Sequence, residues 1–284
     1  MKSPLPELKW TFKSLNLASP KVMGILNLTP DSFFDGGKYN SIDLALQQFE
    51  DMVRQGAAII DIGAFSTRPF AQTVNESGEW DRLKSILPML RKTFPDTHIS
   101  LDTYRSKIAE KAIDGGVDMI NDISGGVFDD KMFDIIAKYK VPFIMMHING
   151  NPQTMQQNPV YENVVDEVGK FLEGQIEKLA KYGVNENIIL DPGFGFGKTV
   201  DHNYLLLGGL QKLKKHGYPV LAGLSRKSMI NKVIGIKPEE ALNGTSAINM
   251  LALINGADIL RVHDVKEAVE VVKLYEKYRE NNPG

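Results

Sequence analysis

The sequence predicts a single closed (β/α)8 barrel, because of its length, its eight short apolar runs and the helix-patterned segments between them. The chain has 284 residues, 43% of them hydrophobic, which is enough for one large core of this kind. The eight runs span residues 22–26, 58–62, 98–101, 118–120, 142–146, 187–190, 219–221 and 258–260. Most are rich in Val, Ile and Leu without strict alternation, which is typical of parallel strands buried on both faces.

Segments with helical spacing of apolar residues separate the runs. One contains Ile42, Leu44, Ala45, Phe49, Met52 and Val53, and another contains Val164, Val165, Val168, Phe171, Leu172, Ile176 and Leu179. A doubly wound open sheet is the alternative, but its glycine-rich phosphate turn should follow an early strand, and residues 27–31 contain no glycine. We therefore expect an N-terminal extension (1–19), the barrel (20–280) and a short C-terminal tail (281–284), with long loops after the first and second strands.

The composition excludes several classes of protein. Lys and Arg number 33 against 35 Asp and Glu, so the chain lacks the basic excess of a nucleic-acid-binding protein. There is no cysteine, which excludes disulfides, thiolate catalysis, Cys-ligated zinc and iron–sulfur clusters. No apolar run resembles a signal peptide or approaches the roughly 20 residues of a membrane span. We expect a soluble, cytoplasmic protein that binds neither nucleic acid nor membrane.

Polar side chains end each of the eight runs, where the chemistry of this fold is located. They are Asn27, Asp61, Asp102, Asn121, His147, Asp191, the segment 225–228, and Arg261 with His263. Any single one is equally compatible with a helix cap, but eight around one rim predict a small-molecule site. Met146, one residue before His147, is a candidate apolar wall at the same mouth, although methionine at such a position is most often part of the core.

The residue types indicate what the site binds. Four of them suit the donor and acceptor edge of a flat heterocycle such as a pterin or purine: Asp102, Asn121, Asp191 and Lys227. Three others suit phosphate oxygens: Arg68, Arg261 and His263. Asn27 offers a neutral oxygen to a Mg²⁺ that already carries phosphate oxygens. The long loops 27–40 and 63–78 are candidate lids, with an ordinary surface excursion as the alternative.

Residues 193–199 look like a phosphate loop, but Pro192 stands where the Walker pattern needs its first glycine, so we set that interpretation aside. His98, His202 and His216 lack the spacing of zinc ligands and are expected to pack or face solvent.

A series of motifs in order resembles the dihydropteroate synthases. They are residues 27–33 (Asn-Leu-Thr-Pro-Asp-Ser-Phe), 66–69 (Ser-Thr-Arg-Pro), 102–103, 121–122, 146–147, 191–196 (Asp-Pro-Gly-Phe-Gly-Phe), 225–227 (Ser-Arg-Lys) and 261–263 (Arg-Val-His). The match runs from about residue 20 to 280. It implies a homodimeric (β/α)8-barrel transferase of folate biosynthesis and a target of sulfonamides. Such an enzyme joins 6-hydroxymethyl-7,8-dihydropterin diphosphate to 4-aminobenzoate with Mg²⁺, giving 7,8-dihydropteroate and pyrophosphate.

The resemblance also implies roles for individual residues. The pterin would contact Asp102, Asn121, Met146, Asp191, Phe196, Lys227 and Arg261. The diphosphate would contact Asn27, Arg68, Arg261 and His263, with Asn27 as the metal ligand. The 4-aminobenzoate would lie among Phe33, Thr67, Pro69, Phe196, Lys227 and Ser228. The expected catalytic residues are Asp35, Arg68, Lys227 and Arg261.

The residues themselves are compatible with that chemistry. Diphosphate departs readily when Mg²⁺ and arginines neutralise the charge that builds on it. The pterin cation that remains is attacked directly by an aryl amine, so the protein supplies no nucleophile. Closing loops would exclude water from the cation, and Asp35 is a candidate to stabilise it. The helix that begins near Lys227 presents backbone N–H groups suited to the aminobenzoate carboxylate.

The second loop departs from the common family pattern Gly-Gly-Glu-Ser-Thr-Arg-Pro-Gly, because this chain has Ala64 and Phe65 before the shared residues and Phe70 after them. We expect Phe70, which replaces a flexible glycine, to weaken sulfonamide binding more than aminobenzoate binding. An unchanged ratio of sulfonamide Ki to aminobenzoate KM in Phe70→Gly would contradict this. A ring turned away from the pocket is an equally good interpretation.

Two alternatives remain. A corrinoid-dependent methyltransferase shares the Asp/Asn/Asp ring, but it does not account for Arg68, Lys227 and Arg261 together. A non-catalytic paralogue would bind pterin without turnover. Dimerisation follows from the resemblance alone, since the apolar positions Leu242, Ile248, Leu251 and Leu253 fit either a dimer face or barrel packing.

Overall fold

The computed structural model describes residues 7–10, 13–28, 41–64 and 75–282, and these form the expected (β/α)8 barrel. The parallel strands are β3 (Lys21–Asn27), β4 (Ile59–Gly63), β5 (His98–Asp102), β6 (Met119–Asp122), β7 (Phe143–Met146), β8 (Ile188–Asp191), β9 (Leu221–Ala222) and β10 (Ile259–Val262). They pair in the order β8-β7-β6-β5-β4-β3-β10-β9, and a bridge between Leu190 and Val220 joins the two ends. All eight predicted runs are confirmed as strands, with ends that differ by at most two residues.

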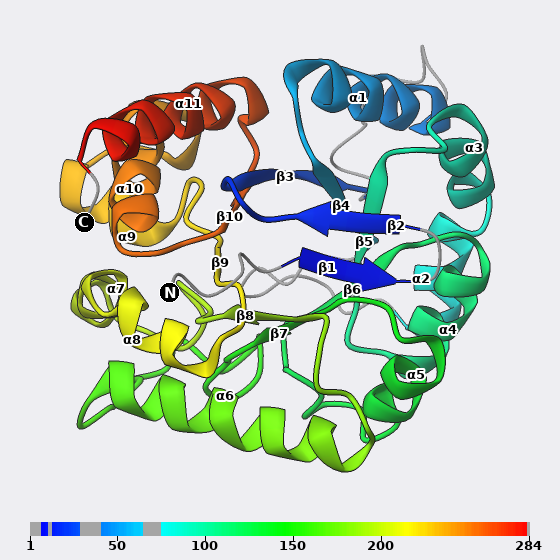
Figure 1. Ribbon diagram of the computed structural model, residues 1–284, viewed down its shortest axis with the longest axis horizontal. Coiled ribbons are helices and arrows are strands. Elements are labelled where there is room, and N and C mark those ends of the chain that lie inside the picture. Colours follow the sequence, from blue (N-terminus) through cyan, green and yellow to red (C-terminus); the bar gives the residue numbers. More distant parts are fainter. Residues whose placement is uncertain (1–6, 11–12, 29–40, 65–74, 283–284) are drawn as a thin grey trace.

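Helices surround the strands as an outer ring that follows the chain order in Figure 1. They are α1 (Ser41–Gln55), α2 (Glu76–Leu83), α3 (Ile86–Thr93), α4 (Ser106–Asp114), α5 (Met132–Tyr139), α6 (Val164–Lys181), α7 (Val200–Gly208), α8 (Leu210–Leu213), α9 (Ser228–Ile234), α10 (Leu242–Ile254) and α11 (Val265–Asn281). Single turns of 3-10 helix follow α8 (Lys214–His216) and precede α10 (Pro238–Glu240).

The two segments predicted from apolar spacing are confirmed as helices α1 and α6. Helix α1 buries Ala45, Phe49 and Met52, which are spaced by four and three residues and therefore share one face. Helix α6 begins at its N-cap Asn163, whose side chain accepts hydrogen bonds from the next turn, as expected for this residue type. Strands β4, β6, β7 and β8 are buried along their whole lengths, which explains why they lack the alternation of apolar and polar residues found in half-exposed strands.

The segment before the barrel contains an antiparallel hairpin of β1 (Glu7–Trp10) and β2 (Lys13–Asn16). Trp10 packs on the His98 ring, with 5.2 Å between ring centroids. The Lys9 backbone N–H donates to Asn187 Oδ1 at 2.9 Å, and Asn187 Nδ2 donates back to the Lys9 carbonyl at 2.6 Å. Because His98 and Asn187 stand at the starts of strands, the hairpin covers the amino end of the barrel, opposite the mouth where the strands end.

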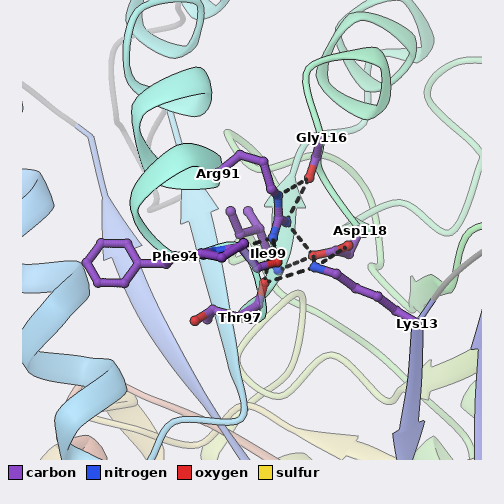
Figure 2. A network of polar contacts seen from close by, with 8 residues as sticks. Lys13, Arg91, Phe94, Thr97, Ile99, Gly116 and Asp118 are labelled. Carbon is purple, nitrogen blue, oxygen red and sulfur yellow. Dashed lines mark hydrogen bonds and ion pairs between the residues drawn. The ribbon is translucent and has the colours of Figure 1, made fainter.

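An ionic network at the same amino end ties the hairpin to the barrel, as Figure 2 shows. Asp118 accepts from Arg91 Nη2 at 2.6 Å and from the Ile99 N–H at 2.8 Å, and it pairs with Lys13 Nζ at 3.0 Å. Arg91 Nε also donates to the Gly116 carbonyl at 3.0 Å. Each charge is therefore paired or hydrogen-bonded, as a half-buried ion needs to be, and β2, α3, β5 and the segment before β6 are held together.

Candidate active site

The strand register places the predicted polar residues at one level of the barrel mouth. Asn27 is opposite Gly63, Gly63 is opposite Asp102, and Asp102 is opposite Asn121 on successive strands β3 to β6. On β7 and β8, Met146 and Asp191 are likewise opposite each other. Because the carboxyl ends of the parallel strands meet at one mouth, side chains far apart in the sequence surround the same space.

Asp61, on β4, joins residues from three other strands in the floor of this mouth. Its Oδ2 accepts from Arg261 Nε at 2.6 Å and from Asn121 Nδ2 at 2.9 Å. Arg261 Nη2 also donates to Asp102 Oδ2 at 3.0 Å. From sequence alone, Asp61 is a rim residue without an assigned role, because a buried aspartate gives no sequence signal of its partners. The structure thus brings Asp102, Asn121 and Arg261 together through a residue that we had not assigned.

Two carboxylate oxygens in this network are left with unused hydrogen-bonding capacity. Asp61 Oδ1 and Asp102 Oδ1 are buried and accept no hydrogen bond from the described residues. Buried polar atoms nearly always have a partner. These oxygens are therefore available to the N–H groups of a ligand that enters the barrel.

Burial and neighbouring charge set the ionisation of the site. Burial raises the pKa of Asp102 to about 7, although the Arg261 guanidinium opposes the shift. Burial also raises the pKa of Asp191 and lowers the pKa of Lys227 to about 8, with the Asp191 carboxylate opposing. Burial acts to lower the pKa of Arg261, but the carboxylates of Asp61 and Asp102 outweigh it, and the net shift is upward.

The opposite side of the mouth pairs a cation with an aromatic ring. Lys227 Nζ donates to the Phe194 carbonyl and lies 4.3 Å from the centroid of the Phe196 ring, within the range of a cation–π contact. Asp191 is fixed by the Gly193 N–H, which donates to its Oδ1 at 2.7 Å.

Apolar side chains complete the wall. The buried members of this mouth cluster are Ile123, Met146, Ile148 and Met155, and the partly buried ones are Tyr104, Phe128 and Phe196. Met146 therefore belongs to a small apolar cluster with residues of the neighbouring loops, and its contact with a ligand stays a prediction. A flat ring with polar edges fits such a combination of walls.

The remaining described candidates lie at the ends of β3 and β10 and at the start of α9. Asn27 is half-buried at the end of β3, and His263 follows β10, the neighbouring strand. Ser225 Oγ lies 3.0 Å from His263 Nδ1 and accepts the His263 N–H at 3.2 Å. Its own hydrogen is therefore free to bond Nδ1 and to orient the imidazole. Ser228 is the exposed first residue of α9, beside Lys227.

Several predicted residues lie outside the described part of the chain. They are Phe33 and Asp35 of the first long loop, and Phe65, Thr67, Arg68, Pro69 and Phe70 of the second.

The structure describes the contacts that fix the chain on both sides of the second loop. Arg82 Nη1 donates to the Ala64 carbonyl at 2.6 Å. Glu79, fully buried on α2, accepts from Thr103 Oγ1 at 2.6 Å and pairs with Arg105. Helix α2 is therefore fixed against the residues that follow Asp102, next to the mouth.

A third long loop, residues 147–163, lies between β7 and α6 and was not predicted. It packs on the glycine-rich loop 192–199 after β8. Tyr161 OH donates to the Gly197 carbonyl at 2.8 Å, and Gln156 Nε2 donates to the Gly195 carbonyl. The sequence does contain a signal for this loop. The gap between the apolar run that ends at residue 146 and the helical pattern that begins at Val164 is at least as long as the predicted loops 27–40 and 63–78.

The fold and the site define a pterin-binding barrel enzyme, and comparisons with known proteins agree. The family model described as "Pterin binding enzyme" matches residues 23–263. A dihydropteroate synthase from Synechocystis sp. is 47% identical over 255 residues, which cover 89% of this chain and 88% of that protein.

Solved structures are similar over nearly the full length. The Yersinia pestis dihydropteroate synthase in a sulfonamide drug complex has a TM-score of 0.90 and 39% identity, covering 97% of this chain and 100% of that chain. The Xanthomonas albilineans dihydropteroate synthase with 4-aminobenzoic acid has a TM-score of 0.90 and 36% identity, covering 96% and 98%.

The chain belongs to the dihydropteroate synthase family, as the sequence motifs predicted. It is a transferase of folate biosynthesis, and this assignment decides against the methyltransferase alternative. Among helices of the described ranges, none combines the length and the apolar character that are needed to cross a membrane.

Proposed function

We propose that the mouth of the barrel binds 6-hydroxymethyl-7,8-dihydropterin diphosphate and 4-aminobenzoate and joins them into 7,8-dihydropteroate with release of pyrophosphate. The observation that carries the proposal is the pair of unpartnered, buried carboxylate oxygens on Asp61 and Asp102, beside Asn121 and Arg261. A pterin presents ring N–H and amino groups along its edge, which are the donors that such oxygens need.

In this proposal the pterin lies between the polar floor and the apolar wall. Asp102, Asn121 and Asp191 bind its edge, and Lys227 donates to its ring acceptors. Met146 and Phe196 pack near the ring, and Arg261 covers one face, held in place by Asp61.

The diphosphate would lie at the rim, near Asn27, Arg261 and His263, with Arg68 from the second loop. The donor set of Asn27 fits a Mg²⁺ that is held mainly by phosphate oxygens and water. Asn27 supplies one neutral side-chain oxygen, and no hydrogen bond within the described residues occupies it. Bound there, the ion would neutralise charge on the departing diphosphate.

The reaction needs positioning and charge stabilisation rather than a protein nucleophile. The bond between the pterin methylene carbon and the diphosphate oxygen breaks, and its electron pair leaves with the diphosphate. Arg68, Arg261 and His263 donate to the developing negative charge. The amine nitrogen of 4-aminobenzoate then forms a bond to the methylene carbon and loses a proton. Asp35 would stabilise the intermediate cation, and loops 27–40 and 63–78 would exclude water from it.

The second substrate would bind on the outer side of the pterin. Phe196 and Lys227 form the described part of that pocket, and Ser228 would bind the carboxylate from the start of α9. Phe33, Thr67 and Pro69 would complete it from the two long loops.

The proposal is tested by measuring pyrophosphate release with the pterin diphosphate, Mg²⁺ and 4-aminobenzoate, and by leaving out each in turn. Release that requires all three, with dihydropteroate formed, is the expected result. Tight pterin binding without turnover would instead identify a non-catalytic paralogue.

We further propose a cytoplasmic homodimer of one barrel domain (20–280). Of the four apolar positions considered from sequence, Leu242 and Leu251 are exposed and Ile248 and Leu253 are buried. Exposed apolar side chains continue on the neighbouring helices: Leu205 on α7, Val233 and Ile234 on α9, Ile254 on α10, and Leu274 and Tyr278 on α11. Apolar surface on adjacent helices is typical of a subunit interface.

A further inference from the structure

The loop 192–199 carries a buried lysine that the proposed reaction does not use. Lys198 is 3% exposed, and among the described residues no other lysine or arginine side chain is as buried. An ammonium group in such a place needs hydrogen-bond acceptors for its three protons. Its surroundings supply them.

Three acceptors surround Nζ of Lys198, whose pKa is lowered to about 7 by burial although the Asp191 carboxylate opposes the shift. Nζ lies 2.9 Å from His147 Nδ1, 2.9 Å from the Gly193 carbonyl oxygen and 3.0 Å from the Phe196 carbonyl oxygen. His147 begins the loop after β7, and the two carbonyls belong to the loop after β8. Burial and the Lys198 charge lower the pKa of His147 to about 3, so the imidazole is neutral, and its tautomer with the proton on Nε2 accepts at Nδ1. Lys198 therefore joins two loops of the mouth at one point.

The contacts of Lys198 lie next to Phe196 and Lys227, two residues that we assign to the substrates. Phe196, whose carbonyl is bound, carries the ring beneath Lys227. The Lys227 ammonium donates to the carbonyl of Phe194, between the two residues bound by Lys198. A Cβ at Gly195 would come within 2.9 Å of Lys227 Cδ, and one at Gly193 within 1.9 Å of the His147 carbonyl oxygen. The loop therefore fits against both neighbours closely, and a shift of its backbone would move Phe196 and Lys227.

We propose that Lys198 is a positioning residue that holds Phe196 and Lys227 in the geometry of the aminobenzoate pocket. The inference rests on the proposed function and extends it to a residue that touches neither substrate. Three of the proposed pterin contacts, Asp102, Asn121 and Arg261, are linked through Asp61 on β4 and do not involve this loop. In contrast, Phe196 and Lys227, which form most of the described part of the aminobenzoate pocket, both contact it. Loss of Lys198 should therefore affect the second substrate more than the first.

The test compares Lys198→Met with Lys13→Met, its matched control. Lys13 also belongs to a partly buried network, in which it forms an ion pair with Asp118, but this network lies at the opposite end of the barrel. Both variants should unfold at lower temperature than the parent. At a temperature where all three are folded, we expect Lys198→Met to raise the KM for 4-aminobenzoate about tenfold or more. Calorimetric affinity for the pterin diphosphate, measured without aminobenzoate, should fall by a clearly smaller factor, because Asp102, Asn121 and Arg261 keep their contacts. Lys13→Met should leave both quantities unchanged.

Two outcomes would overturn the inference: an unchanged aminobenzoate KM in Lys198→Met, or an equal loss of affinity for both substrates. If Lys198→Met does not fold, Lys198→Gln, which keeps one donor, is subject to the same expectations. The parent protein is assayed in parallel. Absence of turnover in the parent would contradict the proposed function itself, whereas parental turnover with unaltered variant kinetics would contradict the role of Lys198 alone.

Discussion

At the scale of single residues, the site depends on how a few buried charges share hydrogen bonds. One oxygen of Asp61 accepts from both Arg261 and Asn121, so a single carboxylate orients two side chains that we assign to the pterin. Hydrogen bonds to charged groups in such surroundings contribute about 1.5–3 kcal/mol each. Asp61 is therefore expected to matter for substrate binding although we assign it no direct contact with the reacting atoms.

We expect Asp61→Asn to fold and to lower kcat/KM for the pterin diphosphate by roughly tenfold or more. The amide keeps the shape of the carboxylate but lacks the charge that holds the Arg261 guanidinium. Steady-state kinetics provide the measurement, with Asp201→Asn, an exposed aspartate on α7, as the control. Parental kinetics in Asp61→Asn would show that Arg261 is positioned by Asp102 alone.

The shifted pKa values predict a bell-shaped pH dependence of kcat/KM for the pterin diphosphate. As the pH falls through about 7, Asp102 takes up a proton and loses an acceptor. As the pH rises through about 8, Lys227 loses its charge. Asp102 faces Arg261 and Asp61, and Lys227 faces Asp191, Arg261 and Asp102. Activity should therefore be greatest between these values.

The alkaline limb can be assigned with Lys227→Arg. Arginine stays charged across the measurable range, so this limb should move upward by more than one pH unit even if the rate falls. A limb that stays at the same pH in Lys227→Arg would mean that another group titrates there.

At the scale of elements, the two ends of the barrel have different roles. The carboxyl ends of the strands carry the site, whereas the hairpin β1–β2 and the Asp118 network close the amino end. The helical and strand segments were predictable because they are long apolar patterns. The hairpin was not, since its two strands contain no apolar run, and its stability comes from Trp10, Leu8 and Leu15 packing into the core of the barrel.

Trp10→Ala should lower the free energy of unfolding by about 3 kcal/mol or more, because it removes a large buried side chain. Trp10 is 7% exposed and packs on His98, far from the mouth. Chemical denaturation measures the loss, and Lys9→Ala, an exposed neighbour, serves as the control. Since the site is at the other end, both KM values should equal those of the parent, and a large rise in either would show that the hairpin supports the mouth.

At the scale of the whole molecule, the apolar surface on α7, α9, α10 and α11 predicts a second copy as its partner. Leu251 is 45% exposed on α10 and Leu274 is 65% exposed on α11. We expect Leu251→Glu to convert a dimer into a monomer, because a carboxylate would be desolvated in the interface. Sedimentation equilibrium measures the mass.

Val160→Glu is the matched control for that experiment. Val160 is 72% exposed in the loop before α6, on another part of the surface, and its substitution should leave the dimer intact. A monomeric parent, or a dimeric Leu251→Glu, would exclude this face as the interface.

The sequence by itself determined the class of fold, the eight strands and the identity of most candidate residues. Buried parallel strands have a continuous apolar pattern, and the polar residue that ends each run is read directly from the chain. Asp102, Asn121, Asp191, Lys227 and Arg261 were found in this way.

The tertiary structure decided which of these residues touch and which unassigned ones support them. Asp61 meets Arg261 across 200 positions, and Lys198 meets His147 across 51. Such contacts depend on strand register and on barrel closure, and no local pattern encodes them. Pro192 already excluded a phosphate loop at residues 193–199, but only the fold places Nζ of Lys198 among three acceptors between two loops.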